Sequence, residues 1–163
     1  MGERVLDQTR TAVEALIDGD IHAARRVVSQ ERKIDYMELD ADDGIFGLIA
    51  KRAPTAIDLR LILALSKVVG DLERAGDKAA RIAACAIELQ TRGSRLPETK
   101  ILHHFRQMSE LACRMLTSSL DALARTDVDL ALGVFAQDRG LELEFDAAMR
   151  HLITFVFEDA SLV

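Results

Sequence analysis

Three pairs of acidic residues share one spacing along this chain of 163 residues. The pairs are Glu31 with Asp35, Glu73 with Asp77, and Asp138 with Glu142. The two acids of each pair are four positions apart, so on a helix both side chains project from the same face. Like charges at this spacing repel each other by roughly 0.2–0.5 kcal/mol. A bound cation would offset that repulsion, which makes each pair a candidate metal site.

Neighbouring cations compensate only half of these acids. Arginines lie three or four positions from Asp35, Asp77 and Glu142, namely Arg32, Arg81 and Arg139. Glu31, Glu73 and Asp138 have no such neighbour. Clusters of carboxylate oxygens suit hard or borderline cations, so Fe, Zn, Mn or Mg ions are the expected ligands. The alternative is that the acids only solvate an exposed helix face.

The elements that must carry these pairs are helices. Alanine and leucine are abundant and the chain has only two prolines, a composition typical of an all-α fold. Gly19 followed by Asp20 indicates a helix end and the next N-cap, and Pro54 is expected in the first turn of a later helix. The predicted helices cover about residues 3–17, 21–50, 54–91, 97–125 and 127–158.

The third predicted helix has an apolar seam with steps of three and four residues, which is typical of antiparallel helix packing. The seam comprises Leu65, Val68, Leu72, Ala75, Ala79, Ile82, Ala86 and Leu89. Glu73 and Asp77 are expected on its outer, solvent-facing side. Gly76 costs roughly 1 kcal/mol in a helix interior, so it indicates either close helix approach or ligand access.

An internal repeat indicates how the helices are grouped. Residues 15–35 recur without a gap at residues 122–142, polar positions included. The sequence therefore predicts tandem antiparallel three-helix bundles of the spectrin-like kind, at residues 1–92 and 97–163. The second bundle is expected to lack its third helix.

Composition excludes several functional classes. The net charge of −6 and the 4% aromatic content argue against nucleic-acid binding. No apolar stretch approaches the ~20 residues of a membrane span, and the N-terminus has no signal-peptide pattern. Cys85 and Cys113 are isolated and are interpreted as reduced core thiols, which predicts a cytoplasmic protein.

Residues 52–83, RAPTAIDLRLILALSKVVGDLERAGDKAARIA, resemble the PhoU family of phosphate-transport regulators. That family has a signature of approximately Pro-x-Ala-x-Asp-Leu-Arg, followed by Asp-Leu-Glu-Arg-x-Gly-Asp. Residues 54–60 match the first part, and residues 71–77 match the second. The resemblance extends over nearly the whole chain and implies two similar three-helix bundles.

The resemblance also implies a function. Family members are negative regulators of phosphate uptake and of the phosphate-starvation response. They couple a phosphate ABC transporter to a sensor histidine kinase, peripherally at the inner face of the membrane. Some bind iron or zinc clusters at acid-x-x-x-Asp motifs, which implicates Glu31, Asp35, Glu73 and Asp77. In the second copy, Glu142 stands where an Asp is usual.

Other residues support a regulator rather than an enzyme. No Ser/His/Asp order, Gly-rich phosphate loop or Glu-x-x-His motif is present, and His103 and His104 are interpreted as surface residues. Asp58, Arg60 and Arg74 are candidate partner-binding residues, although helix capping and ion pairing would also explain them. A homo-oligomer is expected. The alternative functions are a metal-binding helical bundle without a signalling role and a purely structural scaffold.

Overall fold

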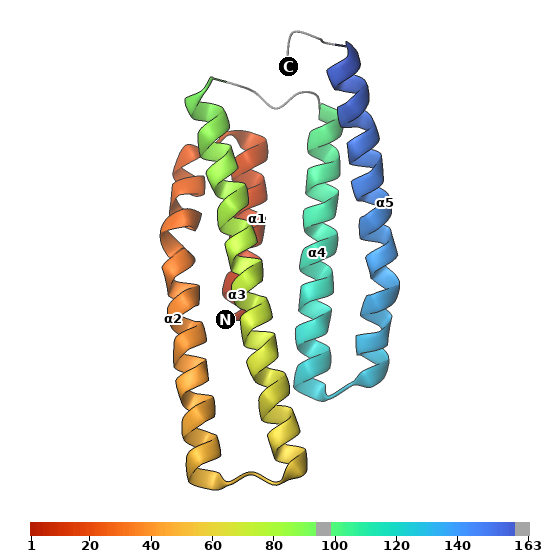
Figure 1. Ribbon diagram of the computed structural model, residues 1–163. Helices are drawn as coiled ribbons and strands as arrows, with labels where there is room; N and C mark the ends of the chain where they lie inside the picture. Colours follow the sequence, from red (N-terminus) through yellow and green to blue (C-terminus); the bar gives the residue numbers. More distant parts are fainter. Residues whose placement is uncertain (94–98, 159–163) are drawn as a thin grey trace.

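The computed structural model describes residues 1–93 and 99–158, and apart from short connections that part of the chain is helical, with no strand (Figure 1). Its helices are α1 (Gly2–Asp18), α2 (Ile21–Arg52), α3 (Ala56–Thr91), α4 (Thr99–Arg125) and α5 (Val128–Glu158). The all-α prediction is therefore confirmed, and most helix ends lie within two residues of the expected positions.

The junction between α1 and α2 forms as the sequence predicts. Gly19 adopts a left-handed conformation with φ of 71°, which ends α1. The Asp20 side chain accepts a hydrogen bond from the backbone N–H of Ala23 at 3.0 Å, and this bond lowers the pKa of Asp20. Asp127, the repeat counterpart of Asp20, accepts from Leu130 N–H at 2.9 Å in the same way.

The start of α3 differs from the prediction. Pro54 does not lie in the first turn, because α3 begins at Ala56 with Thr55 as its N-cap residue. Ala53 ends α2 in a left-handed conformation with φ of 44°. Pro54 therefore belongs to the short connection between α2 and α3. The predicted helix start at Pro97 lies outside the described residues.

The first three helices pack against one another as an antiparallel bundle, and α4 pairs with α5 and also packs against α1 (Figure 1). One core cluster consists mainly of alanines from α1, α2 and α3, which permits close helix approach. A second cluster contains Val5, Ile34 and Leu72, and Leu116 and Leu120 of α4 pack against it. This second cluster joins the three-helix bundle to α4, while the predicted domain division at residues 92 and 97 stays a prediction.

The two cysteines lie in different surroundings. Cys113 is buried, as a core thiol should be, but Cys85 is exposed, so the core interpretation of Cys85 is wrong. None of the helices in the described part of the chain is both long enough and apolar enough to cross a membrane.

Candidate metal centre

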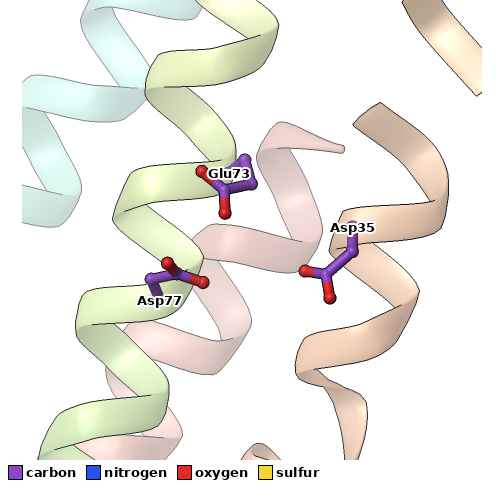
Figure 2. Close-up of side chains that lie close together, drawn as sticks. All are labelled: Asp35, Glu73 and Asp77. Carbon is purple, nitrogen blue, oxygen red and sulfur yellow. The ribbon is translucent and has the colours of Figure 1, made fainter. Parts of the chain in front are cut away.

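Three carboxylates from two helices point toward one another between α2 and α3 (Figure 2). They belong to Asp35 of α2 and to Glu73 and Asp77 of α3, and one oxygen of each lies within 4.8 Å of the others. All three residues are half-buried. The sequence predicts Glu73 and Asp77 on the outer, solvent-facing side of α3, but α2 partly covers them and only part of each side chain remains accessible to solvent.

The antiparallel register of α2 on α3 assembles this cluster. Asp35 lies beside Glu73, and further along α2 Asp42 accepts a hydrogen bond from the Ser66 hydroxyl at 3.4 Å. Glu38 lies between these two levels on α2, where its charge acts on Glu73. The three α2 acids follow one another at steps of three and four, so they share the helix face that packs on α3.

Gly76 explains why the two helices come close at this level. A Cβ at Gly76 would lie 2.7 Å from Cδ1 of Ile34, a fully buried α2 residue. Gly76 therefore permits close packing of α2 on α3. Of the two roles that the sequence left open, close helix approach and ligand access, the structure supports the first. Because Ile34 directly precedes Asp35, the contact of Ile34 with Gly76 also determines the level at which Asp35 meets Glu73.

The electrostatics of the cluster are unfavourable when all its members are ionised. Burial raises the pKa of Glu73, and the charges of Asp77, Glu38 and Asp35 raise it further. None of the ion pairs within residues 1–93 and 99–158 involves a cluster residue. The expected neighbours Arg32 and Arg81 therefore do not neutralise it.

The geometry of these three carboxylates could hold a cation. Three oxygens converge from two helices, and half-burial leaves the remaining coordination positions open to water. Mg²⁺ and Mn²⁺ prefer such oxygen ligands and keep several waters, and iron or zinc also accepts carboxylates. A bound cation would replace the mutual repulsion around Glu73 by attraction.

The other predicted metal ligands are placed differently. Glu31 is half-buried one turn before Asp35 on α2 but is not a member of the cluster. Asp138 and Glu142 are exposed on α5, beside a shallow pocket that Phe145 also lines. Within the described residues, no third acid, histidine or cysteine joins them as Asp35 joins Glu73 and Asp77. A metal site at that pair stays a prediction.

The candidate partner-binding residues have local roles in the structure. Asp58 accepts a hydrogen bond from the Thr55 hydroxyl at 3.0 Å in the first turn of α3. Arg74 pairs with Asp71 on the exposed face of the same helix. Arg60 is exposed. Capping and ion pairing account for Asp58 and Arg74, and contact with a partner stays a prediction for all three.

Sequence reasoning missed Glu38 as a neighbour of the cluster. The signal was available in the spacing, because Glu31, Asp35, Glu38 and Asp42 follow a heptad pattern along α2. The predicted pairs contain only acids four residues apart, so the step of three from Asp35 to Glu38 lies outside them.

Comparison with known proteins places this chain and its fold in a family. The family model described as the PhoU domain matches residues 1–86. A phosphate-specific transport system accessory protein PhoU homolog from Pseudomonas aeruginosa is 40% identical over 159 residues, which is 98% of this chain and 64% of that protein. The accessory protein PhoU of Escherichia coli is 32% identical over 163 residues, which is 100% of this chain and 66% of that protein. This chain thus spans about two thirds of the length of these relatives.

A solved structure agrees with the sequence comparison. The crystal structure of PhoU from Pseudomonas aeruginosa superposes with a TM-score of 0.90 at 38% identity, covering 99% of this chain and 76% of that one. A homolog from a Burkholderia species is 34% identical over all 163 residues of this chain, which cover 69% of that protein. The matched motif, the helical fold and these relatives agree: the chain belongs to the PhoU family.

Proposed function

We propose that this chain is a regulatory accessory protein of a phosphate ABC transporter that lowers phosphate uptake and represses the phosphate-starvation response. The observation that carries the proposal is the similarity to phosphate-specific transport system accessory proteins over 98–100% of the chain. In this proposal, the protein acts at the cytoplasmic face of the membrane and couples the transporter to a sensor histidine kinase.

The carboxylate cluster has a part in this proposal. A cation held by Asp35, Glu73 and Asp77 would link α2 to α3 and stiffen the α2–α3 pair. Rigid helices present a fixed surface to a partner, which lowers the entropy lost on binding. The cluster would then support partner binding rather than carry out a reaction.

A complementation experiment tests the regulatory role. The chain is expressed in bacteria that retain the transporter and kinase but lack their own PhoU relative, and a phosphate-starvation reporter is measured in phosphate-rich medium. We expect the reporter to fall and phosphate uptake to slow. A variant with Asp35→Asn, Glu73→Gln and Asp77→Asn should repress less, whereas Asp43→Asn, an exposed acid on the same helix, should repress normally.

A reporter that stays high while the chain accumulates at normal levels would contradict the regulatory role. Equal repression by the triple variant and the wild type would show that repression does not depend on the carboxylate cluster. The Asp43→Asn control separates these results from a general effect, because it shows what the loss of one acid outside the cluster does to repression.

The geometry also supports a second candidate, a metal-binding helical protein without a signalling role. The supporting observation is the cluster itself, in which three half-buried carboxylates converge without a paired cation in the described part of the chain. Metal binding without repression in the complementation experiment would favour this candidate.

Metal binding is measured directly with Mn²⁺, which gives an electron paramagnetic resonance signal. We expect the wild type to bind Mn²⁺ and to gain about 2.7 kcal/mol of stability when free Mn²⁺ is one hundred times the dissociation constant. The triple variant should bind none, and Asp43→Asn should behave as wild type. Identical Mn²⁺ titrations for wild type and triple variant would rule out the cluster as the site.

A further inference from the structure

A second polar cluster lies between α4 and α5, away from the carboxylate cluster. The Nδ1 atom of His104 lies 2.8 Å from Oε2 of Glu144, and its Nε2 atom lies 2.9 Å from Nδ1 of His151. His104 comes from α4, and the other two residues come from α5. The side chains of His104 and Glu144 are 14% and 29% exposed, whereas His151 is exposed to solvent.

These contacts determine where the protons lie on His104. An ionised Glu144 only accepts hydrogen bonds, so His104 donates from Nδ1. In neutral His104, Nε2 then carries a lone pair directed at His151. In the hydrogen-bonded form His151 donates from Nδ1, but its exposed ring can carry the proton on Nε2 instead. Two imidazole lone pairs then face each other.

We propose that His104 and His151 form a binding site for a divalent transition metal ion of the Zn²⁺ class, with Glu144 orienting His104 from behind. Zn–N bonds of about 2.05 Å at a tetrahedral angle place two ligand nitrogens about 3.3 Å apart. Binding one ion widens the 2.9 Å separation to this value and turns the exposed His151 ring out of its present hydrogen bond, so that both lone pairs converge on the ion. Moving the proton of His151 to Nε2 releases no proton, so the neutral pair binds the ion without net deprotonation.

The contact of Glu144 with the far nitrogen of His104 is the feature that favours a metal site over a simple hydrogen bond. Histidines that bind metals donate their other ring N–H to a carboxylate or carbonyl, which orients the ring and makes the ligating nitrogen more basic. Imidazole ligands select Zn²⁺, Ni²⁺ or Cu²⁺, in contrast to the all-oxygen cluster between α2 and α3. Water completes the coordination on the exposed side, and the ion would clamp α5 to α4.

The test is a Zn²⁺ titration of the untagged chain by calorimetry. The parent for the titration carries Asp35→Asn, Glu73→Gln and Asp77→Asn, so that the carboxylate cluster does not contribute. We expect one Zn²⁺ per chain. His151→Ala should abolish binding, and Glu144→Gln should weaken it about tenfold or more. His103→Ala is the matched control, because His103 is exposed, adjacent to the site and bonded only to Gln107 among the described contacts of its ring.

Histidine ring nitrogen shifts in NMR spectra identify the ligand atoms. Zn²⁺ should shift Nε2 of His104 and Nδ1 of His151 and leave both nitrogens of His103 unchanged. His151→Ala is the decisive variant because His151 is exposed, and circular dichroism checks that it remains helical. A His151→Ala variant with the affinity of its parent, or a parent that binds no Zn²⁺, would overturn the proposal.

Discussion

At Glu73, burial and neighbouring charge act on the carboxyl group in the same direction. Glu73 is half-buried against α2, and Asp77, Glu38 and Asp35 all repel its negative charge. Each effect favours the protonated form, so the pKa of Glu73 is raised. A carboxylate in this position is unfavourable for the cation-free fold near neutral pH and favourable once a cation is bound.

This raised pKa predicts how stability depends on pH in the cation-free protein. Above the ordinary value of 4.5, the folded chain holds a proton on Glu73 that the unfolded chain has lost. The free energy of unfolding should therefore decrease as the pH rises from 4.5 through the raised pKa. Glu73→Gln should remove this decrease and stabilise the cation-free protein at pH 7, by about 0.5 kcal/mol for the contact with Asp77 alone.

Urea unfolding at several pH values in the presence of a chelator measures the effect. The matched control is Glu14→Gln, an exposed glutamate on α1, which should retain the pH dependence of the wild type. If Glu73→Gln follows the wild-type curve at every pH, the carboxylates do not repel one another as the structure indicates.

At the scale of the elements, α3 contains two glycines in contrasting surroundings. A Cβ at Gly76 would meet Ile34 Cδ1 at 2.7 Å, whereas a Cβ at Gly70 would meet only Glu38 Oε1, at 3.7 Å. Both positions are helical, so alanine gains about 1 kcal/mol of helix propensity at either one. Packing against α2 therefore decides the sign of the net effect.

We expect Gly76→Ala to lower the free energy of unfolding by about 1 kcal/mol, because overpacking at Ile34 costs typically 1–3 kcal/mol. Gly70→Ala should raise it by up to about 1 kcal/mol. Thermal unfolding should show the two melting temperatures moving in opposite directions, by about 2–4 °C per kcal/mol. A gain in stability for Gly76→Ala would mean that α2 moves away without cost.

At the scale of the whole molecule, α5 presents a large apolar surface. Its exposed side chains include Phe135, Phe145 and Phe157, which are 77%, 55% and 83% exposed. Phe135 also lines a groove of about 760 Å³ between α3, α4 and α5. Apolar patches of this kind mark surfaces that another chain or segment covers. The exposed phenylalanines of α5 therefore predict that this chain self-associates.

The prediction is an oligomer in light scattering at micromolar concentration. Phe135→Ser with Phe145→Ser should shift the mass toward a monomer, because each covered phenylalanine contributes roughly 1.5–3 kcal/mol. Phe46→Ser is the matched control, since Phe46 is 69% exposed on α2, outside this surface. A double variant with the same mass distribution as the wild type would show that α5 does not mediate association.

The sequence by itself determined the features that depend on local backbone geometry. Gly19 and Asp20 predicted the junction of α1 and α2, and the four-residue spacing placed Glu73 and Asp77 on one helix face. The signature at residues 71–77 predicted the family. These inferences held because 3.6 residues per turn and the chemistry of helix ends apply within a single segment.

Only the tertiary structure decided which faces meet. It brought Asp35 to Glu73 in a half-buried position between α2 and α3, and it joined His104 to His151, which are 47 residues apart. Contacts between helices depend on their register and rotation, which are determined by packing such as that of Ile34 on Gly76. Spacing along one helix does not contain that information, so the partners of a side chain required the assembled bundle.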